Sequence, residues 1–258
     1  MKKYTLTLIL ALVSLGLYAQ TNRNKTIINA ALHGWEYEIK AGVNLGGTAP
    51  LPFPEEIRSI DGYNPTLSIT IEGNMTKWLD SKKKWGIITG LRFENKGMRT
   101  KATVKNYNME IIGYDGNRLK GNWTGGVRTK VQNSYITIPV LAAYKLNPRT
   151  TLKLGPYFSY LMDGDFSGHV YEGYLRETNP TGDKINFTNG AIATYDFSGD
   201  LRKFQWGVQA GVDWKAFKHL KVHADLNWGL NDIFNKDFKT VTFDMYAIYL
   251  NVGFGYAF

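Results

Sequence analysis

TFDMYAIYLNVGFGYAF, residues 242–258, closes the chain and alternates in character from Tyr246 onward. Large apolar or aromatic side chains take every second position, and the residues between them are mostly small or polar. A period of two puts these two sets on opposite faces of a β-strand. An apolar face opposite a glycine-rich face is typical of a strand with lipid on one side and a crowded lumen on the other. The last strand of a soluble sandwich would also have one apolar face, so the other segments must decide.

Seven further segments alternate in the same way, which gives eight in total. Outer-membrane barrels use an even number of antiparallel strands, each about ten residues long. The sequence therefore predicts an all-β fold, an eight-stranded antiparallel up-and-down transmembrane β-barrel. The seven segments are residues 35–45, 66–75, 85–97, 135–146, 151–162, 203–216 and 220–230.

The connections between these segments alternate strictly between short and long. Short periplasmic turns and long extracellular loops are the pattern of an outer-membrane barrel, and they bring both ends of the sheet to the periplasmic side, where it can close. A soluble barrel such as a lipocalin shares the up-and-down order but would place its apolar face inside. Within the second long connection, further alternation suggests a hairpin above the membrane. The short turns are residues 80–84, 147–150 and 217–219, and the long loops are 46–65, 97–134, 163–202 and 231–241.

The N-terminus has the features of a secretory signal. Lys2 and Lys3 precede an apolar run over 6–17, and Ala19 is a suitable cleavage residue. We therefore expect a signal peptide over 1–19, a periplasmic segment over 20–34 and the barrel over 35–258. The expected location is the outer membrane of a diderm bacterium.

The composition limits the chemistry and the partners. With no cysteine, the chain cannot be a lipid-anchored lipoprotein and has neither disulfides nor thiolate metal sites. The formal charge of +9 becomes +7 when Lys2 and Lys3 leave with the signal. For an exported protein we expect such a basic surface to meet anionic lipid or polysaccharide and not nucleic acid. The other expected partners are outer-membrane lipid and the barrel-insertion machinery, with Tyr256 and Phe258 as a C-terminal insertion signal.

Several motifs resemble the PorT-like outer-membrane β-barrel family. ITIPV at 136–140 followed by LGPYFSYL at 154–161 is similar to its central hairpin, in which an "IP" strand precedes a "GPY" strand. FQWGVQAG at 204–211 resembles the next strand, and NWGLNDI at 227–233 resembles a later strand end. The resemblance covers about residues 35–258. It implies an outer-membrane barrel and, through the family's namesake, a role accessory to protein secretion. The long second and third loops depart from the family pattern.

Charged residues occupy inward-facing positions of the predicted strands. An eight-stranded barrel is only wide enough for side chains to fill it. Because both signs are present, we expect a network of paired charges that closes the lumen. A proton or ion path is the alternative interpretation. The predicted network comprises Glu38, Lys40, Glu72, Arg92, Glu94, His223 and Asp225, with Lys145, Lys153, Asp213 and Lys221 also facing inward.

The sequence contains few signatures of catalysis. The histidines are His33, His169, His219 and His223, and neither a G-x-S-x-G motif nor a serine beside a rim histidine accompanies them. The sequence Asp163-Gly164-Asp165 lacks the remaining ligands of a calcium loop. We therefore expect no catalytic residue, no cofactor and no metal. A lipid-modifying outer-membrane enzyme and a small-solute channel are the alternatives.

The long loops are the expected working surface, since function concentrates on loops that a rigid scaffold presents. Aromatic side chains with polar neighbours suit contact with a saccharide or a protein, although simple loop packing is the plainer reading. The expected function is a non-enzymatic structural or binding scaffold. The candidate contacts in the third loop are Tyr171, Tyr174, Phe187, Tyr195 and Phe197.

Overall fold

The computed structural model describes residues 34–113 and 116–258. The expected signal peptide, the segment that follows it up to residue 33, and His33 lie outside these residues. Within the described ranges, no helix is long and apolar enough to cross a membrane.

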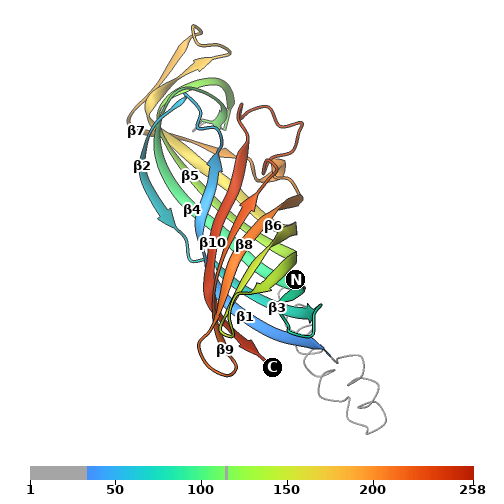
Figure 1. Cartoon of the computed structure of the whole chain (residues 1–258). Helices are drawn as coiled ribbons and strands as arrows, with labels where there is room; N and C mark the ends of the chain where they lie inside the picture. Colours follow the sequence, from blue (N-terminus) through green and yellow to red (C-terminus); the bar gives the residue numbers. More distant parts are fainter. Residues whose placement is uncertain (1–33, 114–115) are drawn as a thin grey trace, which may run out of the picture. The chain divides into compact units, whose positions relative to one another are not determined.

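Eight strands form a closed antiparallel ring, as predicted (Figure 1). Each ring strand pairs with its neighbours in the order β1-β3-β4-β5-β6-β8-β9-β10, and β10 pairs with β1 from Glu38↔Ala257 to Pro50↔Met245. Closure leaves no sheet edge in lipid, where unpaired backbone groups would be costly. The ring strands are β1 (Trp35–Pro50), β3 (Ile69–Trp78), β4 (Trp85–Ile112), β5 (Arg118–Lys145), β6 (Thr150–Glu177), β8 (Phe204–Lys215), β9 (Leu220–Gly229) and β10 (Met245–Ala257).

The three predicted short turns lie together at one end of the ring, here called the turn end. The Asp80 carboxylate accepts hydrogen bonds from the backbone N–H groups of Lys84 and Trp85, both at 2.8 Å, which is the usual way in which Asp fixes a turn. The end of β10 is also here, because the Ala257 N–H donates to the His219 carbonyl at 2.8 Å. Tyr256 stacks on the His219 ring with centroids 5.3 Å apart. Both predicted insertion-signal residues, Tyr256 and Phe258, are exposed, and their role in insertion stays a prediction.

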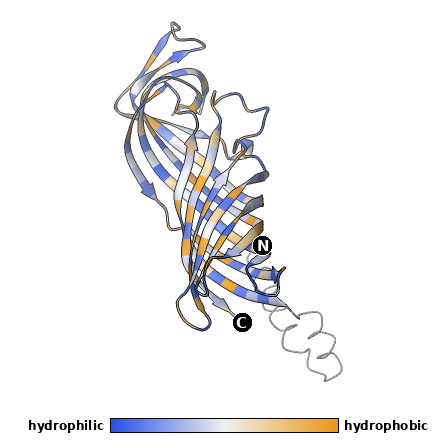
Figure 2. Cartoon of the chain, in the orientation of Figure 1, coloured by the Kyte–Doolittle hydropathy of each residue, from blue (hydrophilic) through white to orange (hydrophobic). Residues whose placement is uncertain are grey.

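The outer face of the ring is an apolar band that ends in aromatic side chains. Figure 2 shows hydrophobic and hydrophilic residues alternating along the strands. The predicted faces are confirmed, since the outward apolar residues are exposed or partly exposed and most of the inward polar residues are buried. Aromatic residues at both borders of an apolar band are typical of outer-membrane barrels. The exposed aromatics include Trp85, Trp214, Phe217 and Tyr256 near the turn end and Phe93, Tyr160, Phe204 and Trp228 near the other end.

The predicted long loops consist largely of β-structure, because most of this sequence continues the sheet beyond the ring. β4, β5 and β6 each have 28 residues, far beyond the roughly 9–11 that cross a bilayer. β2 (Ile57–Pro65) pairs with the far half of β4, and β7 (Lys184–Asp196) pairs with the far half of β6. Continuing the strands satisfies backbone groups that a loop of this length would leave without partners. The hairpin expected within 97–134 is confirmed by the β4–β5 register.

We call this second part of the fold the extension. It consists of β2, β7, residues 97–112 of β4, residues 118–132 of β5 and residues 162–177 of β6, together with η1 (Ser198–Asp200) and residues 231–244. The extension has its own apolar core, in which Ile111 and Trp123 have no exposed surface. It is therefore built as a water-soluble sheet, with apolar side chains inside.

The polarity of the two faces inverts along single strands. On the outer face of β4, exposed Phe93 gives way to exposed Arg99. On its inner face, buried Glu94 gives way to buried Val104. The alternation keeps the same phase across this change, so the same face of β4 continues to point outward. What changes along the strand is the medium that surrounds it. The inversion therefore marks the level at which the strands leave the membrane.

Candidate functional site

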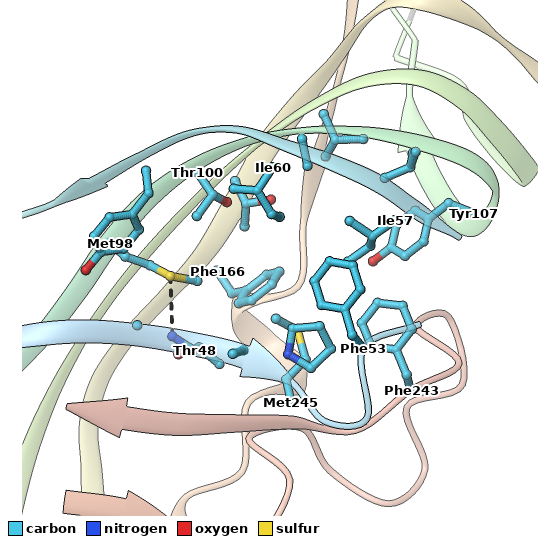
Figure 3. A pocket seen from close by; sticks show the side chains of 18 of the residues that line it. Thr48, Phe53, Ile57, Ile60, Met98, Thr100, Tyr107, Phe166, Phe243 and Met245 are labelled. Atoms are coloured by element: carbon cyan, nitrogen blue, oxygen red, sulfur yellow. Dashed lines mark hydrogen bonds between the residues drawn. The ribbon is translucent and has the colours of Figure 1, made fainter. Parts of the chain in front are cut away.

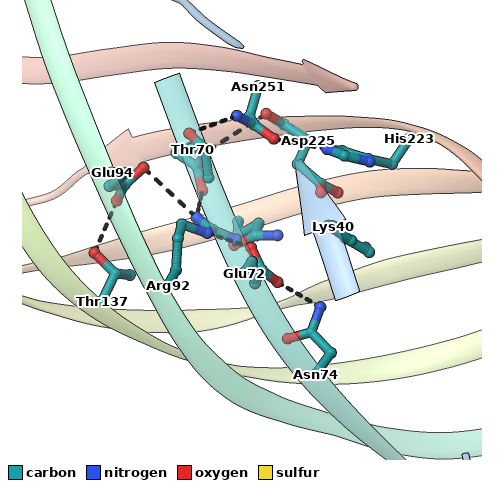
Figure 4. Close-up of polar contacts among 12 residues, drawn as sticks. Lys40, Thr70, Glu72, Asn74, Arg92, Glu94, Thr137, His223, Asp225 and Asn251 are labelled. Carbon is teal, nitrogen blue, oxygen red and sulfur yellow. Dashed lines mark hydrogen bonds and ion pairs between the residues drawn. The ribbon is translucent and has the colours of Figure 1, made fainter. Parts of the chain in front are cut away.

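Arg92 fills the centre of the lumen and joins its opposite walls. The guanidinium of this β4 residue is ion-paired with Glu72 on β3. It also donates to the Gln209 side chain on β8 at 2.8 Å and to the Asn227 side chain on β9 at 3.1 Å. Figure 4 shows Arg92 between Glu72 and Glu94. Arg92 has no exposed surface, so its charge is compensated entirely by these side chains.

A second cluster of charges lies nearer the turn end. The Lys153 ammonium is 2.7 Å from the Asp225 carboxylate and also pairs with Asp213, which accepts from Lys40 at 3.1 Å. At the rim, Lys221 and Glu38 pair at 2.9 Å. These side chains come from β1, β6, β8 and β9, so the cluster ties strands together across the ring.

Amides and a histidine complete the lumen. The Nε2 atom of His223 lies 2.8 Å from the Asn251 side chain, which in turn donates to Asn44 at 2.8 Å and to Thr70 at 3.0 Å. The Thr137 hydroxyl donates to Glu94 at 2.7 Å. Buried polar groups are thus paired mostly with each other.

All seven residues predicted for the lumen network lie in the lumen. Of the other inward-facing residues, Lys153, Asp213 and Lys221 join it. Lys145 does not, because its ammonium lies over the Trp78 ring at 4.2 Å near the turn end. Lys96 was missed, although it continues the inward phase of Arg92 and Glu94. Its ammonium pairs with Glu94 at 3.0 Å. The ammonium also lies within about 6 Å of the ring centres of Tyr135, Tyr157 and Tyr249.

On the outer surface of the extension, basic side chains from three adjacent strands gather around a hollow of about 1010 Å³. Lys101 on β4 is opposite Arg128 on β5, which is opposite His169 on β6. Arg99 on β4 is likewise opposite Lys130 on β5. We call these five residues, together with Tyr171, the basic face.

The charge of the basic face is only partly neutralised. Lys130 is ion-paired with Asp165, and Lys101 lies near Asp61. The Arg128 guanidinium lies 5.3 Å from the centre of the Tyr171 ring, an arrangement that leaves its charge available to a ligand. Burial and the neighbouring Arg128 charge lower the pKa of His169. Among the described residues, Arg99 and Arg128 have no ion-pair partner, so they supply most of the free positive charge.

The five candidate loop contacts separate into two groups. Tyr171 and Tyr174 are half-buried on the outer surface, where the Lys184 ammonium lies 4.0 Å from the centre of the Tyr174 ring. Phe187, Tyr195 and Phe197 are buried in the core of the extension, so the expectation of surface contacts does not fit these three. Whether any of the five contacts a ligand stays a prediction.

The described histidines have structural partners. The His219 Nδ1 atom lies 2.7 Å from the Ala257 carbonyl oxygen, and His169 contacts the Tyr171 ring. Within residues 34–113 and 116–258, no group of three or more His, Asp or Glu side chains is arranged to hold a metal ion.

Residues 18–235 match a family model described as "Outer membrane protein beta-barrel domain". No curated protein matches the chain significantly. Among solved structures, the chain is similar to the attachment invasion locus protein Ail of Yersinia pestis, with 12% identity over 87% of this chain and 97% of that one and a TM-score of 0.37. It is also similar to Neisserial surface protein A, with 10% identity over 87% and 97% and a TM-score of 0.31. The protease OmpT of Escherichia coli shows 12% identity over 88% and 97%, with a TM-score of 0.34.

Proposed function

The chain belongs to the outer membrane protein beta-barrel domain family and lies in the bacterial outer membrane, and from this premise we propose that it is a non-enzymatic binding scaffold. Its extracellular basic face would hold an anionic saccharide. The barrel would anchor the extension and conduct no solute.

The basic face is the observation that carries this proposal. It combines two guanidinium groups that have no ion-pair partner among the described residues, those of Arg99 and Arg128, at the lining of a hollow. The Tyr171 ring packs against Arg128 beside this hollow. The basic face lies on the outer surface just beyond the apolar band. Guanidinium groups bind sulfate, phosphate and carboxylate well, and tyrosine rings give apolar contact to sugar rings. A saccharide with acidic substituents at the cell surface meets both requirements.

Two further features support the non-enzymatic and non-conducting parts of the proposal. Side chains from opposite walls meet across the lumen at Arg92, which argues against a solute channel. A lipid-modifying enzyme would need a histidine as a base, but His169, His219 and His223 contact a tyrosine ring, a backbone carbonyl and an amide, respectively. We therefore propose that none of these three described histidines is catalytic.

Binding of sucrose octasulfate tests the proposal, because this sulfated disaccharide combines sugar rings with negative charges. We expect salt-dependent binding that falls at least tenfold in the triple variant Arg99→Gln, Lys101→Gln, Arg128→Gln. The control Arg118→Gln, Lys236→Gln, Lys239→Gln removes the same charge from exposed positions outside the basic face and should bind as the parent does. Equal losses in both variants would mean that net charge alone attracts the probe and would refute a site.

The PorT-like resemblance supports a second candidate, a role accessory to protein secretion. The motif hairpin is formed by β5 and β6, with Pro139 opposite Tyr157. Such a role would require a periplasmic partner at the short turns. Crosslinking from Ser81 or Lys218 should then capture a protein, and it should do so equally well from the triple variant of the basic face.

A further inference from the structure

The extension encloses a cavity of about 480 Å³ between β1 and β2 (Figure 3). Its walls carry Met98 and Val104 from β4, Phe166 from β6, and Phe243 and Met245 from the segment before and at the start of β10. Among the described residues, no charged side chain lines it. The volume is within the range of pockets that hold small molecules, roughly 300–1,000 Å³.

The cavity is reached through a gap between two strands that do not pair. In the described part of the chain, β2 pairs only with β4. The last residues of β1, Gly46 to Pro50, pair with β10. The free edge of β1 is satisfied by side chains. The Thr48 N–H donates to the Met98 sulfur at 3.3 Å, and the Tyr63 hydroxyl donates to the Gly46 carbonyl at 2.6 Å. These contacts satisfy one backbone N–H and one backbone carbonyl on an edge of β1 that no strand covers, so an opening can persist there.

The gap begins at the upper border of the lipid-facing band. Leu45, which is exposed and opposite Leu250, directly precedes the cavity-lining residues Gly46 and Gly47. The rim of the gap carries exposed apolar residues, with Phe53, Ile60 and Tyr63 each at least half exposed. An apolar rim in water is unfavourable, and contiguous exposed apolar surface usually marks a binding region. Here it links the lipid-facing surface to the cavity.

We propose that the cavity binds an unbranched alkyl chain, which enters through the gap between β1 and β2. The lining favours a flexible apolar ligand, because the methionine side chains at 98, 109 and 245 adapt to irregular shapes. The hydroxyls of Thr129 and Tyr195, which also line it, are 2.7 Å apart and hydrogen-bonded to each other. Because they bond to each other, these two hydroxyls have little hydrogen-bonding capacity left for a sugar or an ion. The chain can belong to an outer-leaflet lipid or to a free hydrocarbon.

The cavity and the hollow of the basic face are neighbours, because Tyr63, Thr100, Thr129 and Tyr195 line both. The basic side chains point outward, whereas Thr100 lies between Arg99 and Lys101 and faces the cavity. The two proposals are tested separately, since the probe for the cavity is uncharged and the probe for the basic face is an anion.

Nuclear magnetic resonance of ¹³C-methyl methionines tests the proposal on the parent protein. Met98, Met109 and Met245 line the cavity, whereas Met75 and Met162 are exposed on the outer surface of the barrel. In nanodiscs of deuterated lipid, protonated decane should give saturable nuclear Overhauser contacts to Met98 and Met245. Its contacts to Met75 should rise without saturation, as expected for decane dissolved in the bilayer. Saturable contacts from protonated acyl chains without decane would identify lipid as the source, and contacts from decane alone would identify a free molecule.

A matched pair of variants gives the second test. Ala102→Trp puts a large side chain into the cavity, and Thr103→Trp puts the same side chain on the outer surface of the same strand. The saturable contacts should weaken at least tenfold in the first variant and persist in the second. If Ala102→Trp does not fold, Ile60→Asp at the rim replaces it with the same expected loss. Absence of saturable contacts in the parent, or equal contacts in a folded cavity variant and the control, would overturn the proposal.

Discussion

Arg92 lies at the centre of the lumen with no exposed surface and contacts side chains on both walls. Burying a guanidinium is unfavourable unless carboxylates and amides replace the lost water, and here they do. The same reasoning predicts inward charges from sequence, because a residue in phase with Arg92 must face the same lumen. Lys96 obeys this rule, but it lies next to the end of the predicted strand and was not included in the predicted network. The buried positions of Phe187 and Phe197 had no such signal, since alternation does not tell a core aromatic from a surface one.

Replacing Arg92 by methionine should destabilise the barrel by about 3–5 kcal/mol, because Glu72 would remain buried without its ion-pair partner. The free energy of unfolding in lipid vesicles measures this cost. Lys221→Met is the control, since Lys221 lies at the rim with 21% of its side chain exposed and should cost about 1 kcal/mol or less. Adding Glu72→Gln to Arg92→Met should recover much of the loss, because Glu94 keeps its partner Lys96. Equal costs for Arg92→Met and Lys221→Met would contradict the central role of Arg92.

The strands β4, β5 and β6 show how one element serves two environments. Their membrane-spanning parts were predicted well, because lipid outside and a polar lumen inside impose a period of two with apolar residues outward. Beyond the inversion the outward residues are polar, so the pattern of a lipid-facing strand ends there and the segments between such strands were interpreted as loops. The alternation itself continues with its faces exchanged, so a search for period two regardless of polarity would find the extension. The pairing of β2 and β7 depends on contacts between distant segments and could not be predicted from local pattern.

A pair of substitutions on β5 tests the inversion. Ile138→Arg places a charge on the exposed apolar band and should cost about 2–4 kcal/mol of folding free energy if it lies near the bilayer midplane. Gln132→Arg lies on the same face of the same strand beyond the inversion and should change stability by less than about 0.5 kcal/mol. Urea titration of both variants in vesicles measures the difference. Similar costs at the two positions would mean that both face the same medium.

At the scale of the whole molecule, a barrel with a filled lumen carries a sheet that rises beyond the membrane. The ring was predictable because closure, strand number and turn length are coupled. The ligand sites were not, because they arise where strands from different hairpins meet. The basic face combines residues of β4, β5 and β6, and the apolar cavity depends on a pairing that β1 and β2 do not make. The central claim is that β4, β5 and β6 cross the membrane and continue outside the cell as the extension.

Single cysteines on β4 test this claim most directly, since the chain has no cysteine of its own. In intact cells, a membrane-impermeant maleimide should label Lys101→Cys and Thr103→Cys. It should not label Ile87→Cys or Leu91→Cys, which face lipid, even after the outer membrane is permeabilised. Ser81→Cys in the periplasmic turn should react only after permeabilisation. Labelling of Leu91→Cys to the same extent as Lys101→Cys, or of Ser81→Cys in intact cells, would contradict the account.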